Sequence, residues 1–278
     1  MPELPETETI ARDLDLEIRG AIVATVTVLR SDVLRDASGE EFMRRLPGAQ
    51  VTRVWRRAKL VVVDLESPFG ANHLVIQPRF TGGLLIARDA SPSELGAYVC
   101  LTLGLTDGRQ LHYRDVRRLG TVALMTTARF AEYVRLLGVE PLDPALGDAE
   151  FSGLLRDSRQ SVKVVLMDQR RLAGVGNIYA NEALWRAGID PSREARSLSV
   201  SEAATLRVAL CDVLSASIAA RGTSFRDYRD AHGERGRYVE QLAAYGRAGA
   251  PCRRCGRRLV GTHAIDGRSS VFCPTCQH

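Results

Sequence analysis

The chain has 278 residues, of which 45% are hydrophobic and 26% are charged, which is ordinary for a globular protein and long enough for two domains. No transmembrane segment is predicted, and no basic region followed by an apolar one marks a signal peptide, so we expect a cytoplasmic protein. The net charge of +5 is uneven: residues 221–278 hold 11 arginines against 5 acidic residues, which leaves −1 for the rest. We therefore expect the C-terminal part to meet a polyanion.

Residues 5–19 predict a helix close to the start of the chain. Ile10, Leu14 and Ile18 recur at helical spacing, and Gly20 stands where a C-terminal cap is expected. Such a helix buries one face and fixes the position of the residues that precede it.

β-Rich runs follow as far as about residue 128. They are predicted at residues 21–29, 51–65, 73–87, 97–105, 110–115 and 120–125, with Gly and Asp-Gly breaks between them. The sequence Thr106-Asp107-Gly108 is typical of a hairpin turn. Because these runs lack the strand–helix–strand rhythm of a nucleotide-binding sheet, they predict an antiparallel sandwich or barrel.

The pattern becomes helical after this point. A helix is predicted at residues 130–137, a proline-punctuated linker at 140–144, and further helices between 148 and 220. We place the domain boundary near residue 135.

The first residues contain a candidate nucleophile. Removal of Met1, which is usual before a small residue, makes Pro2 a chain terminus whose secondary amine has Glu3 beside it. Such an amine titrates near pH ~8, so an appreciable neutral fraction can attack a sugar C1′ and form an imine. The alternative is an ordinary helix start, with Pro5 in the first turn and Glu6 favoured by the helix dipole.

A glycine-rich turn is predicted within residues 167–182. A helix ends near Asp168, Gly174 and Gly176 follow, and Asn177 is predicted to cap a second helix. Glycines let a phosphate approach the backbone, and the helix dipole favours its negative charge. The alternative is an ordinary corner between two helices.

Four cysteines form a strong metal signal. Cys252 and Cys255 make one Cys-x2-Cys pair, and Cys273 and Cys276 make a second pair after 17 residues. This spacing suits one structural, tetrahedral zinc ion on a β-hairpin. The alternative, a pair of disulfides, is disfavoured in a reducing compartment.

Two of these stretches resemble one family. The run MPELPETET at residues 1–9 is similar to the N-terminus of bacterial formamidopyrimidine-DNA glycosylases, and residues 167–182 resemble their helix–two-turn–helix. The resemblance implies an α+β fold with an N-terminal antiparallel β-sandwich and active-site helix, a C-terminal helical helix–two-turn–helix domain, and a four-cysteine zinc-finger β-hairpin. The implied domains are residues 1–135, 136–245 and 246–278.

The resemblance also implies an active site. Pro2 would be the nucleophile, Glu3 would protonate the opening sugar, and Glu6 would support both by hydrogen bonding. Lys59 and Arg268 would hold the backbone phosphate at the damaged nucleotide.

The two lysines of the chain, Lys59 and Lys163, stand out among 38 basic residues and suggest that a compact ammonium is wanted at each position. Lys59 follows two arginines on a predicted strand, where the alternative is a solvated strand edge. The resemblance implies that Lys163 and Asn177 bind DNA.

Two loops depart from the family pattern for filling the hole that a flipped base leaves. Phe80 stands where a methionine is usual and Gln77 where a histidine is usual; the second loop keeps Arg117 but has Leu119 in place of phenylalanine. We predict that Phe80 stacks in the duplex, Leu119 wedges the opposite strand, and Arg117 hydrogen-bonds the widowed base. The alternative is that Phe80 and Leu119 are buried packing residues.

The stretch from residue 222 to 247 resembles the loop that closes over a flipped purine in this family. Its candidate lesion-capping residues are Phe225, Arg226, Asp227 and Tyr228. A flexible linker to the zinc finger is the alternative.

The implied function is a bifunctional DNA glycosylase and abasic-site lyase. It would excise 8-oxoguanine and formamidopyrimidines from double-stranded DNA through a Pro2 imine, with β- and δ-elimination, in base excision repair. We expect a monomer that associates with the nucleoid when on DNA and does not bind membranes. The alternatives are an endonuclease VIII-like glycosylase for oxidised pyrimidines, which Leu4 and a full-length capping loop disfavour, and a catalytically inactive DNA-binding relative.

Overall fold

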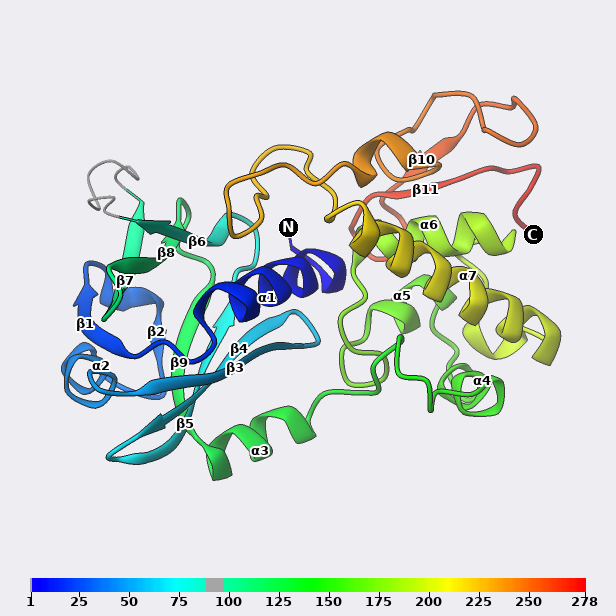
Figure 1. The fold of residues 1–278 in the computed structure, drawn as a ribbon. Coiled ribbons are helices and arrows are strands. Elements are labelled where there is room, and N and C mark those ends of the chain that lie inside the picture. The colour runs from blue at the N-terminus through cyan, green and yellow to red at the C-terminus, as the bar shows by residue number, and fades with distance from the viewer. Residues whose placement is uncertain (1, 89–97) are drawn as a thin grey trace. The chain divides into compact units, whose positions relative to one another are not determined.

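The computed structural model forms two compact units, which are described separately (Figure 1). The structure describes residues 2–88 and 98–278. The first unit contains residues 1–135 and 220–237, and the second contains residues 136–219 and 238–278.

The first unit is built on two β-sheets. One sheet has the strand order β1-β7-β8-β6, with bounds Val23–Val28, Val99–Leu105, Arg109–Asp115 and Gly82–Arg88. The other has the order β2-β9-β5-β4-β3, with bounds Leu34–Arg35, Thr121–Thr126, Gly70–Gln77, Leu60–Ser67 and Gln50–Arg57. Every pair is antiparallel except β2 with β9. The predicted antiparallel sandwich is confirmed.

Both sheets contribute to one hydrophobic core. Val61 and Leu74 of the five-stranded sheet and Leu101 and Leu111 of the four-stranded sheet are each at most 2% exposed and belong to one cluster. Alternation along each strand sends these side chains inward and leaves the next residue on the outer face. The sandwich therefore offers outer sheet faces on which polar residues can be placed.

The strand bounds differ from the prediction in two places. The run at residues 51–65 is two strands, β3 and β4, joined by a turn at Ala58-Lys59, where Ala58 has a φ of 54°. Lys59 therefore lies in a hairpin turn and not on a strand as predicted. Position 97, where a further strand was predicted to begin, lies outside the described residues.

Helix α1 (Leu4–Ile18) forms where the apolar spacing predicts it and packs against β3 and β4. Ile10, Leu14 and Ile18 are at most 1% exposed in the core. This apolar stripe orients the helix towards the core. Two charged residues of the helix, Glu6 and Asp13, are also buried, at 0% and 7% exposure. Gly20 adopts a φ of 83° just beyond its end, as a C-terminal glycine does.

Helix α2 (Gly39–Arg45) was not predicted. Its local signal is a capping box: Ser38 accepts from the N–H of Glu41, and the Glu41 carboxylate accepts from the N–H of Ser38. Helix α3 (Thr127–Arg135) follows β9.

The second unit is helical. It contains α4 (Asp148–Arg156), α5 (Val162–Met167), α6 (Asn177–Ala187) and α7 (Val200–Ala219), followed by the short hairpin of β10 (Val260–Thr262) and β11 (Ser270–Phe272). These elements confirm the predicted helices and zinc-finger hairpin. Among the described residues, no helix combines the length and the apolar character needed to cross a membrane.

Candidate active site and nucleic-acid interface

The chain start is folded into the first turn of α1 and buried. Pro2 is buried, Glu3 is 1% exposed and Glu6 is 0% exposed. Glu3 is the N-cap of the helix, and its backbone N–H donates to Oε2 of Glu6 at 2.8 Å in a capping box. The candidate nucleophile and the ordinary helix start are thus the same structure, because the cap holds both carboxylates beside Pro2.

Residues 220–237 return to the first unit and pack on α1, although the sequence places them in the domain 136–245. Glu6 Oε1 accepts the backbone N–H of Thr223 at 2.7 Å, so one carboxylate joins the helix start to this segment. Gly222 lies directly over it with a φ of +85°, and a Cβ there would be 3.1 Å from Glu6 Oε1. Glycine is therefore needed for the close approach.

A second anchor holds the same segment. The Arg221 guanidinium donates to Asp13 at 2.6 Å and to Asp230 at 2.5 Å, and both carboxylates are buried. Tyr228 is only 6% exposed, and burial raises its pKa well above the usual range. Of the predicted capping residues, Phe225 is exposed at 47%. Arg226 and Asp227 are also exposed, so they are accessible whereas Tyr228 is part of the core.

The two predicted loops for filling the duplex lie side by side in the first unit. The Arg117 guanidinium lies over the Phe80 ring, 4.7 Å from its centroid. Phe80 is 44% exposed and Leu119 is 46% exposed, so neither is a buried packing residue. Below them, Thr81 Oγ1 accepts the N–H of Arg117 at 3.1 Å, which ties the loops together.

Asp115 holds these two loops together where they leave the sheet. Its carboxylate accepts from the N–H groups of Arg117 and Gly120 at 3.2 and 2.7 Å, and it is 1% exposed. Gln77, at the end of β5, accepts from Arg79 Nε at 3.3 Å. The sequence analysis missed Asp115, whose only local signal is an acidic residue at a predicted strand end.

The glycine-rich turn of the second unit is folded around Gln169. Its Nε2 donates to the carbonyls of Met167 and Val175 at 2.8 Å each, and its Oε1 accepts the N–H of Gly174 at 2.9 Å. The N-cap of α6 is Gly176 and not Asn177 as predicted. This corrects the predicted cap: Asn177 is the first helical residue, and its side chain is directed elsewhere.

Asn177 and Asn181 of α6 hold the tip of the zinc-finger hairpin. Asn177 Nδ2 donates to the carbonyl of Ser269 at 3.0 Å, and Asn181 Oδ1 accepts the N–H of Val271 at 2.7 Å. Arg268 lies at this tip, exposed, with its backbone N–H bonded to Asp266 at 3.0 Å. A hollow of about 300 Å³ adjoins Arg268, Asp266 and residues of the glycine-rich turn.

Lys163, for which the resemblance implies DNA binding, lies on α5. Its side chain is 0% exposed, and its ammonium donates to Ser270 Oγ at 2.7 Å, to Asp266 at 3.2 Å and to the Ser269 carbonyl at 3.3 Å. Burial lowers its pKa. The buried ammonium argues against a direct contact of Lys163 with DNA phosphate in this conformation and gives it the role of holding the hairpin tip.

Glu182 of α6 is a further structural anchor that the sequence analysis missed. Its carboxylate accepts three backbone N–H groups, from Ala243, Ala244 and Tyr245, at 2.7 to 2.8 Å. It is 3% exposed, and burial raises its pKa despite these donors. Glu182 thereby fixes the segment that leads into the zinc finger.

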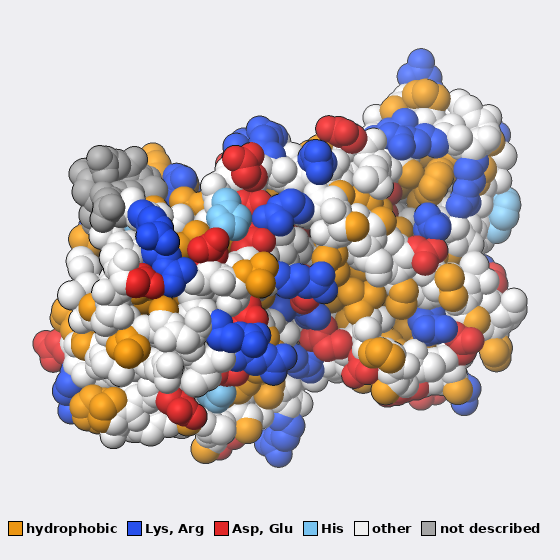
Figure 2. Space-filling model, in the orientation of Figure 1, with side chains coloured by type: hydrophobic (Ala, Val, Ile, Leu, Met, Phe, Trp, Pro, Cys, Tyr) orange, Lys and Arg blue, Asp and Glu red, His pale blue; other side chains and the backbone are white. Residues whose placement is uncertain are grey.

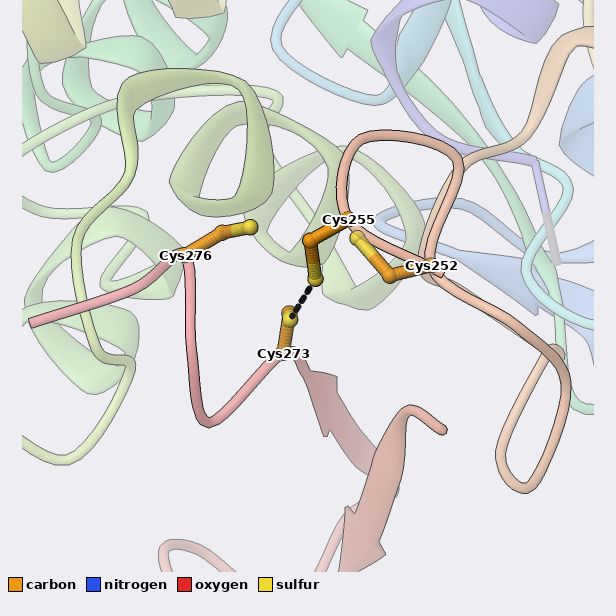
Figure 3. A group of neighbouring side chains, drawn as sticks. All are labelled: Cys252, Cys255, Cys273 and Cys276. Carbon is orange, nitrogen blue, oxygen red and sulfur yellow. Dashed lines mark hydrogen bonds between the residues drawn. The ribbon is translucent and has the colours of Figure 1, made fainter. Parts of the chain in front are cut away.

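The four cysteines converge from the two ends of the hairpin (Figure 3). Their sulfur atoms all lie within 4.8 Å of one another, and those of Cys255 and Cys273 are 3.5 Å apart. Zn–S bonds of about 2.3 Å in tetrahedral geometry place the sulfurs about 3.8 Å apart, so the cluster fits one structural zinc ion. Burial alone would raise the pKa of Cys252, but the N–H groups of Cys255 and Arg254 help to lower it. The neighbouring thiols raise the pKa of Cys276, because the sulfur atoms share protons within the cluster.

The surface charge is mixed on the face shown in Figure 2. Lys and Arg side chains form several groups there, with acidic and hydrophobic side chains between them. Positive charge on this face is therefore not one continuous patch.

Family models match three successive parts of the chain. Residues 1–122 match the formamidopyrimidine-DNA glycosylase N-terminal domain, residues 137–229 match the formamidopyrimidine-DNA glycosylase H2TH domain, and residues 249–278 match the zinc finger found in FPG and IleRS. The β-sandwich, the helix–two-turn–helix domain and the four-cysteine zinc finger together define a class of zinc-finger DNA glycosylases.

Curated relatives agree over the full chain. The formamidopyrimidine-DNA glycosylase of Thermomicrobium roseum is 41% identical over 100% of this chain and 99% of its own, and that of Moorella thermoacetica is 43% identical over 93% of each. The structure of wild-type Lactococcus lactis Fpg with N7-benzyl-Fapy-dG DNA covers 100% of both chains, with a TM-score of 0.90 and 31% identity. The chain belongs to the formamidopyrimidine-DNA glycosylase family.

Proposed function

We propose that this protein is a bifunctional DNA glycosylase and abasic-site lyase that excises 8-oxoguanine and formamidopyrimidines from duplex DNA in base excision repair. The full-length family match supports the activity, and the buried Pro2-Glu3 chain start supports its chemistry. Solved complexes of Lactococcus lactis Fpg contain Fapy-dG DNA, bound to a mutant of that protein, and abasic-site DNA, which supports the same substrate class here. The protein acts as a cytoplasmic, nucleoid-associated monomer.

In the proposed reaction the neutral Pro2 amine attacks C1′ of a flipped nucleotide and the damaged base leaves. Glu3 protonates the sugar ring oxygen as it opens to an imine and then moves protons during elimination. β-Elimination breaks the bond to the 3′ phosphate, and δ-elimination breaks the bond to the 5′ phosphate. Water then hydrolyses the imine, which leaves the sugar fragment as an aldehyde and releases the Pro2 amine.

Glu6 holds the residues of this site in position by hydrogen bonding. Its two oxygens hold the N–H of Glu3 and the N–H of Thr223 at 2.8 and 2.7 Å, so the active-site helix and the candidate capping segment share one carboxylate. This bridge is the observation that carries the proposal, because closure of the segment over a base and alignment of Glu3 would depend on the same group.

The remaining residues hold DNA. Lys59, Asn177 and Arg268 contact backbone phosphates, while Phe80 and Leu119 fill the space of the flipped base. Arg117 and Gln77 bond to the bases or phosphates next to that space, and Lys163 acts by supporting the tip that carries Arg268. One zinc ion, held by the four cysteines, stabilises the finger. The proposed modules are residues 1–135, 136–245 and 246–278, with residues 220–237 of the middle module packed in the first unit.

Borohydride trapping on a duplex that contains 8-oxoguanine tests the imine. The wild-type protein should give a covalent adduct, and Pro2→Gly should give much less. A variant with one extra residue before Pro2, whose nitrogen is then an amide, should give none. Pro5→Ala is the matched control, since it changes a proline of the same helix start without touching the amine. Absence of a wild-type adduct, or equal trapping by the extended variant, would overturn the proposed chemistry.

A lesion panel separates the alternatives. Excision from 8-oxoguanine and formamidopyrimidine duplexes should exceed excision from thymine glycol duplexes. A preference for thymine glycol would favour an oxidised-pyrimidine glycosylase, and binding without cleavage of any duplex, abasic sites included, would favour an inactive relative.

A further inference from the structure

A second polar hollow lies wholly within the first unit, and its lining contains neither Pro2 nor Glu3. It has a volume of about 330 Å³ and opens between strands β6 and β8 and the segment of residues 226–233. Its charged lining consists of Arg114, Arg226, Arg229 and Asp227.

The strand register places Arg114 on the outer face of the four-stranded sheet. Its neighbours on β8, Tyr113 and Asp115, are both 1% exposed, and Tyr113 belongs to the core. Because side chains alternate along a strand, Arg114 is directed to the opposite face. Its partner in register on β6 is Gly83, and Gly83 also lines the hollow.

The described residues balance the positive charge of the hollow only in part. Arg226 pairs with Asp227 at 3.1 Å. Arg229 donates to the carbonyls of Arg226 and Tyr228 at 3.0 and 2.7 Å, which are neutral acceptors. Within residues 2–88 and 98–278, no ion pair is formed by Arg114 or Arg229. Three guanidinium groups against one carboxylate favour an anion in the space between them.

Two glycines leave that space open. A Cβ built on Gly83 or on Gly233 would meet nothing within 4 Å. A bulky group could therefore approach the backbone at both positions, beside the arginines. A tetrahedral oxyanion such as phosphate suits this arrangement, because each planar guanidinium can donate two parallel N–H groups to two of its oxygens.

The hollow adjoins the two loops that fill the duplex. Thr81, which follows Phe80, and Val116, which precedes Arg117, both line it. When Phe80 inserts into the base stack of a duplex, the DNA backbone therefore passes close to the hollow.

We infer that this hollow binds a backbone phosphate of the DNA, one or a few nucleotides from the flipped base, with Arg114 and Arg229 as its donors. The inference rests on the proposed function, since it adds a contact to the same complex. The phosphate belongs to either the damaged strand or the complementary strand. This contact recognises the shape of the DNA backbone next to Phe80 and Leu119, and it does not depend on which damaged base is present.

A neutral-phosphate scan tests the site. Duplexes with a tetrahydrofuran abasic analogue would each carry one methylphosphonate, at successive positions on either strand, and their affinities for wild-type protein and Arg114→Gln would be measured. The wild-type protein should bind more weakly when the methylphosphonate is at one particular position, and Arg114→Gln should be insensitive to a methylphosphonate at that position. The strand that carries this position is the strand that supplies the phosphate. On unmodified duplex, Arg114→Gln should bind about three- to tenfold more weakly, with a salt slope reduced by about 1.

Two further variants make the result specific. Arg88→Gln removes the same charge from the far end of β6, outside the hollow. Its affinity should depend on the position of the methylphosphonate in the same way as that of the wild-type protein. Gly83→Asp places a carboxylate in the open space and should weaken binding at least as much as Arg114→Gln, and thermal melting should show that both fold.

Different outcomes separate this inference from the proposed function. A scan of the same shape for wild type and Arg114→Gln, in a protein that still cleaves 8-oxoguanine duplex, would overturn the phosphate site alone. Equal losses in Arg114→Gln and Arg88→Gln would do the same. A wild-type protein that neither binds nor cleaves damaged duplex would overturn the proposed function and the site with it.

Discussion

Replacing Lys163 by methionine should destabilise the second unit and loosen the hairpin tip. The ammonium has 0% exposure and binds Asp266, the Ser269 carbonyl and Ser270 Oγ at 2.7 to 3.3 Å. Methionine keeps most of the volume of the lysine stem but removes the ammonium that donates to Ser270 Oγ and to Asp266. The Ser269 carbonyl loses one donor and keeps the amide of Asn177. Oδ2 of Asp266 has no protein partner among the described residues, so without Lys163 this carboxylate keeps the backbone N–H of Arg268 on Oδ1 as its hydrogen bond.

Removing one partner of a buried ion pair typically costs about 3–5 kcal/mol. The Asp266 side chain is 11% exposed, so it can turn partly towards solvent and recover some of that loss. We therefore expect Lys163→Met to lower the free energy of unfolding of the second unit by about 2–4 kcal/mol. Asp266→Asn in the same chain should recover part of the loss, because it removes the uncompensated charge.

Chemical denaturation with a probe in the second unit measures the change, and the rate at which a chelator removes zinc reports on the hairpin locally. Zinc loss should be faster in Lys163→Met. The other lysine of the chain supplies the control: Lys59→Met, in a hairpin turn of the first unit, should leave both measurements unchanged. A Lys163→Met protein within ~0.5 kcal/mol of wild type, with unchanged zinc loss, would refute the assignment of Lys163 to the tip.

Three other predictions follow from the structure. Chelation of zinc should abolish DNA binding while circular dichroism shows the β-sandwich still folded, because the finger has a small core and needs its metal; undiminished affinity after metal loss would contradict this. Phe80→Ala should lose more excision of 8-oxoguanine than Leu119→Ala, since only an aromatic ring stacks on a base, for about 1–3 kcal/mol. Cleavage of a preformed abasic site should suffer less, and equal losses on both substrates would argue against a wedge. Finally, a hydrogen-bonded Arg193 and the Ser199 cap lower the pKa of Glu202 from 4.5 to about 2, so this carboxylate stabilises α7 above pH ~4.5 and loses the effect as the pH falls towards 2. Glu202→Gln should therefore flatten the acid side of the stability profile, by less than about 1 kcal/mol because the group is partly exposed; an unchanged profile would contradict this assignment.

Local signals in the sequence were enough for several parts of the molecule. The period of Ile10, Leu14 and Ile18 predicts α1 and its buried face, because both depend only on residues within a few turns. The Cys-x2-Cys spacing predicts the metal cluster for a similar reason: each pair is a short knuckle whose geometry does not depend on the rest of the chain. The capping box of α2 was equally local and could have been found.

Other features required the tertiary structure. The run at residues 51–65 is β-rich throughout and was predicted as one strand, and only the antiparallel pairing of β3 with β4 shows that it folds back at Ala58. Whether Phe80 and Leu119 are exposed depends on how Asp115 and Thr81 tie their loops together, across 34 positions of sequence.

The sequence alone determined the family, the kinds of domain and the metal ligands, since these are carried by short runs of residues, and it predicts a reactive chain start at Pro2. The tertiary structure decided which groups surround them. Lys163 reads in the sequence as a basic residue suited to DNA, yet it lies beneath Asp266, 103 positions away. Glu6 meets Thr223 across 217 positions. Burial and partners of this kind arise when distant segments pack together, and a charged side chain has the same letter in the sequence whether it faces solvent or a buried acceptor.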